Sequence, residues 1–353
     1  MARIKQSPQD FIVKEIPLKT QHSSGPYAHC ILHKKNYTTE RAVSHLARHL
    51  HIPRKKIAYA GTKDKYAQTS QYITIKDVSK EKILDIDLKD IEVEYLSHVS
   101  KPLHLGDLQA NTFSIVIREL EHKEDFFLPA TTDFFVANYF DEQRFSNNNV
   151  EVGLAFIHKQ YDKAVALLQQ DNDYEKLLTP YLKLHTNDYV GALCQLPKKT
   201  LLFFIHAVQS KWFNQELAFE LKKCAKKQHK EEHIRQSSYS QGEFVFSNDI
   251  ELFNCLPKKI NLVGFLTTLT EFEQEVLGQE HIALQDLLNR QFQFLSVEGD
   301  KRSTHFLVKN FTTTPLTKEE GASSYSCTVT FTLPKGCYAT MVVRQLVSSL
   351  HMN

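Results

Sequence analysis

The sequence predicts an α+β protein in which a mainly helical segment interrupts a β-rich region. Apolar and polar residues alternate, as in half-buried strands, in short runs at residues 10–16, 71–75, 112–118 and 327–333. Between about residues 150 and 291, apolar residues instead recur at helical spacing, most clearly in residues 151–169, 203–224 and 283–292. The chain has 353 residues, more than one hydrophobic core usually serves, so two domains are expected.

One helix near the start of the chain is clearly marked. Thr38 or Thr39 can cap it and Glu40 suits its first turn. Its apolar stripe consists of Ala42, Val43, Leu46, Ala47 and Leu50. After this helix, the apolar residues 57–60 predict a strand that leads into Gly61.

The composition is that of an ordinary soluble globular protein, with 42% hydrophobic and 24% charged residues. The net charge is only +2, so a nucleic-acid-binding face has to come from local clusters of lysine and arginine. The candidate clusters are Lys34 with Lys35, Arg54 with Lys55 and Lys56, and Lys222, Lys223, Lys226, Lys227 and Lys230. Each of them could equally be a solvated face of a helix or loop.

The cysteines and the N-terminal residues bear on the cellular compartment. Six cysteines are scattered without CxxC spacing, which favours neither a disulfide framework nor a zinc ribbon. The first residues contain no apolar run, so no signal peptide is expected. The longest apolar runs are too short to cross a bilayer. We therefore expect a cytoplasmic protein that does not involve a membrane.

The residues best suited to chemistry follow Gly61. Asp64 stands between Lys63 and Lys65 on a predicted loop between two strands, and cations that lie close to a carboxylate favour its ionised form. An ionised carboxylate can act as a nucleophile or a general base, although the same pattern also fits a solvated turn. His45 and His49 have the spacing of a two-histidine metal pair on a helix, but no third ligand is evident, so no metal is expected.

The segment GTKDKYAQTSQ (61–71) resembles the signature of the TruD family of pseudouridine synthases, which modify uridine 13 of tRNA. Five further segments resemble that family in the expected order along nearly the whole chain. They are SPQDFIVKE (7–15), LGDLQANTF (105–113) with Arg118, NYFDEQRF (138–145), WFNQ (212–215), and LPKGCYAT (333–340) with Arg344. Two positions depart from the pattern, because Tyr338 stands where relatives often have Phe and Ser146 replaces a glycine.

The resemblance implies a particular fold and division of the chain. We expect a catalytic domain of residues 1–149 and 295–353, built on the mixed, mostly antiparallel sheet of pseudouridine synthases. Residues 150–294 would form an inserted, mainly helical TRUD domain. An insertion requires that its two ends lie close together in exposed connections.

The resemblance also implies roles for individual residues. Asp64 matches the catalytic nucleophile, while Phe11, Asn138 and Tyr338 match positions that line the pocket of the target base. Lys5 and Phe140 match further active-site positions. The alternatives are core packing for the two phenylalanines, a turn for Asn138 and an ordinary strand position for Tyr338. A further NYFDEQRF residue, Arg144, could be a structural partner of Asp64 rather than a catalyst.

The implied reaction is the isomerisation of uridine to pseudouridine in a base that has left its stack. Such a reaction needs no cofactor, and tRNA is the expected partner, with no obligatory protein partner evident. Asp64 could attack the base, attack C1′ or act through an elimination at C2′. Two other interpretations remain open: an RNA-binding protein of the same fold without catalysis, and an unrelated two-domain hydrolase with paired carboxylates.

Overall fold

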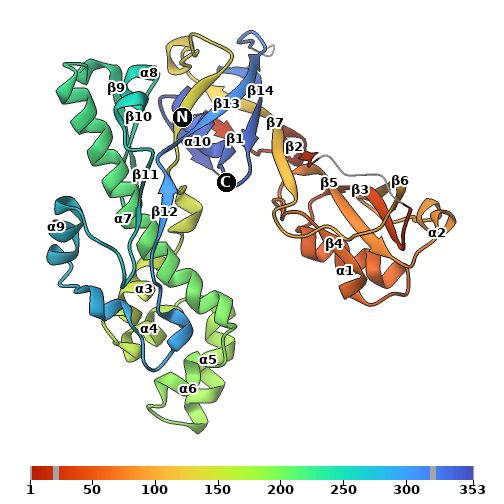
Figure 1. The fold of residues 1–353 in the computed structure, drawn as a ribbon, viewed down its shortest axis with the longest axis horizontal. Coiled ribbons are helices and arrows are strands. Elements are labelled where there is room, and N and C mark those ends of the chain that lie inside the picture. Colours follow the sequence, from red (N-terminus) through yellow and green to blue (C-terminus); the bar gives the residue numbers. More distant parts are fainter. Residues whose placement is uncertain (1, 19–23, 319–322, 353) are drawn as a thin grey trace. The chain divides into compact units, whose positions relative to one another are not determined.

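The computed structural model describes residues 2–18, 24–318 and 323–352 of the chain (Figure 1). Within these residues the chain forms two compact units. We call the first the sheet unit, Met1–Val136 with Phe306–Asn353, and the second the inserted unit, Ala137–His305. The second unit therefore interrupts the first in sequence.

The sheet unit is dominated by strands. They are β1 (Ala2–Ile4), β2 (Phe11–Pro17), β3 (Tyr27–Lys35), β4 (Ile57–Tyr59), β5 (Gln68–Lys76), β6 (Ile91–Val99), β7 (Leu108–Leu120), β8 (Phe134–Ala137), β13 (His305–Thr313), β14 (Tyr325–Pro334) and β15 (Leu350–Met352). Its α-helices are α1 (Thr39–His49), α2 (Lys80–Leu84) and α10 (Ala339–Leu346). Short 3-10 turns are η1 (Pro8–Asp10), η2 (Arg54–Lys56) and η3 (Lys123–Asp125).

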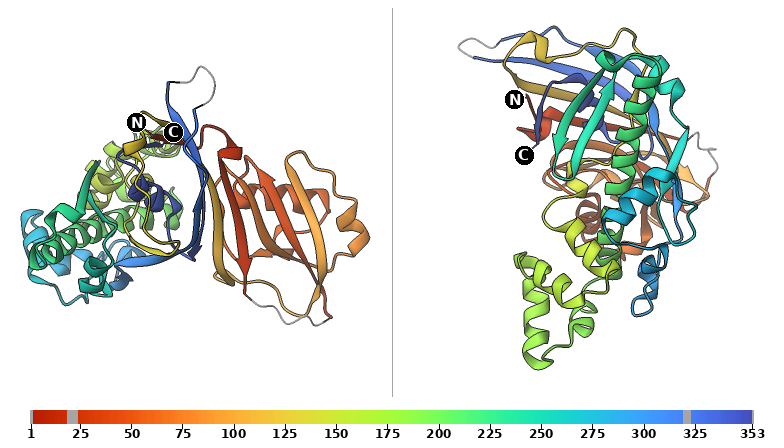
Figure 2. Two further views of the ribbon diagram at one scale, coloured as in Figure 1. Left: turned by 90° about the horizontal axis from the view of Figure 1, so that it is seen from above. Right: turned by 90° about the vertical axis from the view of Figure 1, so that its left-hand side faces the viewer.

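These strands form one mixed sheet of eleven strands among the described residues. Its main path runs β6-β3-β5-β2-β7-β14-β13-β8, while β4 pairs with β5 and β1 pairs with both β15 and β7. The pairings β1–β15 and β2–β5 are parallel, and most of the others are antiparallel. The expected mixed, mostly antiparallel sheet is therefore confirmed, and the strands β13 and β14 that follow the insertion extend it (Figure 2).

The predicted first helix is confirmed as α1. The Thr38 hydroxyl accepts a hydrogen bond from the backbone N–H of Arg41, which caps the helix. The apolar stripe of α1 is buried against β3, β4 and β5, in a core with Cys30, Leu32, Ile57, Ile73 and Ile75. This packing positions the N-terminal end of α1 next to the loop that carries Asp64.

The inserted unit is mainly helical. Its α-helices are α3 (Asn149–Ile157), α4 (Tyr161–Leu168), α5 (Asn172–Leu184), α6 (Tyr189–Leu193), α7 (Lys198–Lys227), α8 (Ile250–Cys255) and α9 (Glu271–Gln279). It also holds the hairpin β9 (Ile234–Tyr239) and β10 (Gly242–Ser247), and the pair β11 (Lys259–Leu262) and β12 (Asp300–Ser303). The 3-10 turns are η4 (Glu142–Arg144), η5 (Glu231–His233), η6 (Leu284–Leu287) and η7 (Gln293–Leu295). The long helix α7 runs beside the β9–β10 hairpin (Figure 2).

Two of the three helical predictions for this segment need correction. Residues 151–169 form two helices, because the chain turns at Lys159, whose φ of 61° is left-handed. Residues 283–292 contain only the turn η6 and no α-helix. The side-chain oxygen of Asn289 accepts the backbone N–H of Phe292 instead, which closes a local turn.

The insertion begins and ends at neighbouring strands. β8 leads into the inserted unit, β13 leads out of it, and the two strands are adjacent in the sheet. Directly beyond them, the N–H of Asn138 donates to the carbonyl of Thr304 at 2.8 Å. The units divide at residues 136/137 and 305/306, whereas the domain boundaries expected from sequence lie at 149/150 and 294/295. The NYFDEQRF segment thus belongs to the inserted unit.

Candidate active site

Asp64 lies on the loop between β4 and β5, and its carboxylate is held by Lys5. The Lys5 ammonium donates to Asp64 Oδ2 at 2.7 Å. The Lys5 side chain is 9% exposed and that of Asp64 is 52% exposed. Within the described residues, Oδ1 of Asp64 makes no hydrogen bond, so only one of the two oxygens of this half-exposed carboxylate is anchored.

The backbone of this loop is held by buried polar groups. The Thr39 hydroxyl, at the start of α1, accepts the N–H of Lys63 at 2.8 Å and donates to the Gln71 side chain at 2.8 Å. The Gln71 amide in turn donates to the carbonyl of Gly61 at 2.8 Å. Thr39 and Gln71 are 1% and 0% exposed, so these bonds are shielded from water. From the sequence, Thr39 was only a possible helix cap and Gln71 only the last residue of the segment 61–71, so neither was expected to hold this loop.

The cation beside Asp64 is Lys5, which is 59 residues away in sequence, and the adjacent Lys63 has a different partner. The Lys63 ammonium forms an ion pair with Glu15 of β2, and both side chains are almost completely buried. The other Glu15 oxygen accepts the N–H of Tyr72 at 3.2 Å. The Lys63 ammonium is thus paired with Glu15 in the core, and the cation that contacts the Asp64 carboxylate is Lys5.

Phe11 lies at the start of β2 and is only 3% exposed. The Lys5 ammonium lies over its ring, 4.1 Å from the centroid, so the positive charge also faces the π electrons of the ring. Asp10 fixes the start of the strand, because its carboxylate accepts two hydrogen bonds from the Arg118 guanidinium, at 2.9 and 3.2 Å. Burial opposes this charge, but the hydrogen bonds from Arg118 prevail and lower the pKa of Asp10.

Hydrogen bonds in the sheet unit join two of the recognised segments to each other and to Ala60, the residue that directly precedes the segment 61–71. The N–H of Gly106 donates to the carbonyl of Ala60 at 2.7 Å, and the Lys335 ammonium donates to the carbonyl of Gly106 at 2.9 Å. Lys335 precedes Gly336, whose φ of 80° suits glycine in this turn. Tyr338 follows two residues later, half-buried, and directly precedes α10. Its role at the target base remains a prediction.

In the inserted unit, Asn138 makes hydrogen bonds at both ends of its side chain. Its amide nitrogen donates to the carbonyl of Ser303 at 2.9 Å, and its Oδ1 accepts from the Arg302 guanidinium at 2.5 Å. Arg302 also donates to the backbone carbonyl of Asn138 at 3.2 Å. Asn138 is 5% exposed. Its carboxamide is thus oriented by β12, a feature that the sequence did not reveal.

Phe140 and Arg144 line an open pocket of about 440 Å³ in the inserted unit, together with Arg302 and His206. The Arg302 guanidinium lies 4.2 Å from the centroid of the Phe140 ring, and the Arg144 guanidinium lies 5.4 Å from it. Arg144 also faces the ring of Phe203 at 4.9 Å. Phe140 itself is 7% exposed and contacts the ring of Phe213 edge-on.

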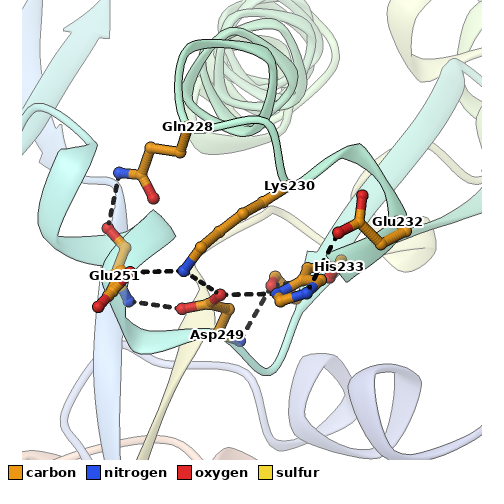
Figure 3. A network of polar contacts seen from close by, with 7 residues as sticks. Gln228, Lys230, Glu232, His233, Asp249 and Glu251 are labelled. Atoms are coloured by element: carbon orange, nitrogen blue, oxygen red, sulfur yellow. Dashed lines mark hydrogen bonds and ion pairs between the residues drawn. The ribbon is translucent and has the colours of Figure 1, made fainter.

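Several of the lysines considered for phosphate contacts are already paired with acids. Lys222 pairs with Glu243, and Lys223 with Glu220. At the end of α7, Lys230 donates to Asp249 and Glu251, and His233 bonds the same Asp249 carboxylate (Figure 3). The hydrogen bond from Lys230 is the main reason that the pKa of Asp249 falls to about 2. Lys226 and Lys227 are exposed and form no ion pair within the described residues.

The other two basic clusters, at residues 34–35 and 54–56, also contain side chains that are paired with acids or buried. Arg54 forms a two-point ion pair with Glu40, and Lys56 pairs with Asp77. Lys34 is 2% exposed, so it cannot contact a phosphate. No group of three or more metal-ligating side chains occurs in the part of the chain that the structure describes. In that part, too, no helix is both long and apolar enough to span a membrane.

Comparison with known proteins places this chain in a family. The model of the tRNA pseudouridine synthase D (TruD) family matches residues 1–172 and 166–346. The tRNA pseudouridine synthase D of Aquifex aeolicus is 29% identical, and the match covers 98% of each chain. The "Probable tRNA pseudouridine synthase D" of Methanosarcina acetivorans is 30% identical over 97% of this chain and 92% of its own. The chain belongs to the TruD family of pseudouridine synthases.

A solved structure shares the fold. The crystal structure of the "Putative tRNA pseudouridine synthase D (TruD)" from Methanosarcina mazei superposes with a TM-score of 0.70 at 23% sequence identity. The match covers 98% of this chain and 93% of the other. The expected fold class, an α+β pseudouridine synthase fold, is therefore confirmed.

Proposed function

We propose that this chain isomerises uridine 13 of tRNA to pseudouridine, with Asp64 as the nucleophile. The observation that carries this proposal is the geometry of Asp64 within the GTKDK segment. One carboxylate oxygen is bound by the buried Lys5, and the other is open to a substrate. A catalytic carboxylate needs a fixed orientation and an accessible oxygen, and this arrangement supplies both.

The reaction breaks the N1–C1′ bond of the uridine, turns the base over and joins C5 to C1′. The hydrogen at C5 leaves as a proton and N1 takes up a proton, so the atoms balance and no redox cofactor is needed. Attack of Asp64 on the base, attack on C1′ and an elimination at C2′ all use an ionised carboxylate. In each case the Lys5 ammonium, at 2.7 Å, supplies the counter-charge for Asp64.

The target base has to leave the RNA stack to be reached. Phe11, Tyr338 and Phe140 are proposed as the aromatic faces of its pocket, and Asn138 as the reader of its edge. The Asn138 amide nitrogen makes one hydrogen bond to Ser303 and its oxygen accepts one from Arg302, which leaves a second N–H and a second lone pair of the carboxamide for a uracil edge. The proposed setting is the cytoplasm, with tRNA as substrate and no obligatory protein partner.

The test is tritium release from tRNA that carries 5-³H-uridine. The wild type should release tritium, and tRNA with cytidine at position 13 should release none at that site. Asp64→Asn keeps the shape of the side chain and should abolish release while tRNA binding persists. Asp85→Asn, a change of the same kind at an exposed aspartate, is the control and should be silent.

The family match excludes the unrelated hydrolase, and the assay separates the two interpretations that are left. Binding without release by the wild type would indicate a non-catalytic RNA-binding protein. Absence of both binding and release would exclude this tRNA as the substrate. If Asp64→Asn retains a tenth of wild-type turnover, Asp64 is not the nucleophile.

A further inference from the structure

Lys34 is a buried lysine that none of the proposed catalytic steps uses. It lies near the end of β3 and is 2% exposed. Its ammonium donates to the backbone carbonyl of Asp64 at 2.8 Å and to that of Tyr37 at 2.6 Å, and it lies 3.5 Å from the carbonyl of Lys63. The three N–H donors of an ammonium group are thus directed at three main-chain oxygens, two of them on the loop that carries Asp64.

We infer that Lys34 is a positioning residue, which holds the main chain of the 63–64 segment so that the Asp64 carboxylate meets the target ribose in a fixed orientation. This inference rests on the proposed function. Lys5 holds the side chain of Asp64 and Lys34 holds its backbone, so the residue is fixed at two points. Lys34 itself is too deeply buried to contact RNA.

The charge balance supports a role beyond packing. A buried lysine has a high desolvation cost unless a counter-charge is near. Burial is the main reason that the pKa of Lys34 falls to about 8, the Asp64 carboxylate raises it, and the Lys63 ammonium lowers it further. A lysine whose only task was to fill the core could be replaced by an apolar residue at lower cost, whereas this one satisfies carbonyl groups of the Asp64 loop.

The surroundings of Lys34 contain few other titratable groups. Its neighbours across the sheet are Thr69 of β5 and Ile91 of β6, neither of which titrates. Lys5 and Glu15 lie one step further away, as the partners of Asp64 and Lys63. On α1, His45 packs edge-on against the ring of Tyr37. A change in kcat or in amide exchange near pH 8 can therefore be assigned to Lys34 if it occurs in the wild type and is absent from a Lys34 variant.

The next residue provides a matched control. Lys35 is on the same strand, is half-buried and forms no ion pair or side-chain hydrogen bond among the described residues. Lys34→Met and Lys35→Met remove the same charge and leave the same side chain. Only the first removes the donors to the Asp64 loop.

Lys34→Met should lower kcat by about tenfold to a hundredfold, since a displacement of about 1 Å at a reacting group costs up to about a hundredfold. Its KM for tRNA should change less than about threefold, because the RNA contacts are elsewhere. The ratio of wild-type kcat to Lys34→Met kcat should shrink between pH 7 and pH 9, as wild-type Lys34 loses its proton. Lys35→Met should match the wild type in kcat and in this pH dependence, and if Lys35 contacts a phosphate, as its cluster in the sequence allows, that loss would alter KM and not kcat.

Hydrogen exchange tests the same inference without catalysis. In Lys34→Met, amides 62–66 should exchange faster than in the wild type, while those of β5 should not. If this variant fails to fold, the wild type still provides a test, because protection of amides 62–66 relative to β5 should fall between pH 7 and pH 9. A Lys34→Met enzyme with wild-type kcat and unchanged exchange would overturn the inference. A wild-type protein that releases no tritium would contradict the proposed function, and the exchange measurement would still show whether Lys34 holds the 63–64 segment.

Discussion

Replacing Glu15 with glutamine should destabilise the sheet unit strongly. The Glu15 and Lys63 side chains are 0% and 6% exposed, so the change leaves a lysine charge in the core without its partner. Removing one member of a buried ion pair costs about 3–5 kcal/mol. For a unit of this size, that corresponds to a fall in Tm of roughly 6–20 °C.

Thermal melting followed by circular dichroism measures this effect. Glu40→Gln is the matched control, because Glu40 pairs with Arg54 but its side chain is 59% exposed, and exposed pairs contribute about 0–1 kcal/mol. The double variant Glu15→Gln with Lys63→Met should recover part of the loss, since no unpaired charge then remains in the core. A Glu15→Gln protein that melts within about 2 °C of the wild type would refute the reasoning.

Three further predictions concern the pocket, the acids and the lysines. Phe11→Ala should reduce tritium release more than tRNA binding, because one stacked base contributes only about 1–3 kcal/mol to binding. Tyr338→Phe should leave tritium release nearly unchanged, and a large loss of release in this variant would assign a role to the hydroxyl. Burial and the nearby Glu273 raise the pKa of Glu216 to about 8. The folded state therefore holds a proton that the unfolded state releases, and the stability of the wild type should fall as pH rises from about 5 to 9. The Tm of Glu216→Gln should change less than that of the wild type over this range. Lys226→Met should reduce the salt slope of tRNA binding by about 0.7–0.9 if it contacts a phosphate, and an unchanged slope excludes that contact.

Features set by local sequence could be predicted. The helix α1 has its cap and its apolar stripe within thirteen residues, Thr38 to Leu50, so neighbouring residues specify it. The strands that alternate in polarity were likewise recognisable. The turn at Lys159 was not, because neither glycine nor proline marks it. Residues 283–292 have the apolar spacing of a helix but do not form an α-helix. Phe292 instead packs against Phe156 and Tyr161, which are distant in sequence.

In the candidate active site, too, residues within one short segment could be identified from sequence, whereas contacts between distant segments could not. Asp64 and its loop were identified from one short segment, whereas the cation beside it comes from 59 residues away. Strand alternation places Glu15 on the buried face with Val13, and Lys34 on the buried face with Leu32, but charged residues are rarely buried, so residue type alone predicts exposure. The Asn138 amide is oriented by Arg302, 164 residues later in the chain. Contacts of this kind depend on sheet topology, which residue spacing does not encode.

The pairing of the first strand with the last has a consequence for biosynthesis. β1 lies parallel to β15, with Ala2 opposite Leu350, and the loop after β1 carries Lys5. Strands β8 and β13 are neighbours although about 170 residues separate them, a stretch that takes roughly 10–30 s to translate at 5–20 residues per second. The nascent chain must therefore keep several strand edges unpaired while the insertion is synthesised, and these edges are a natural target for chaperones. A ribosome-bound chain that lacks β15 should hold Lys5 loosely, so tRNA modification is expected to begin only after the final strand has joined the sheet.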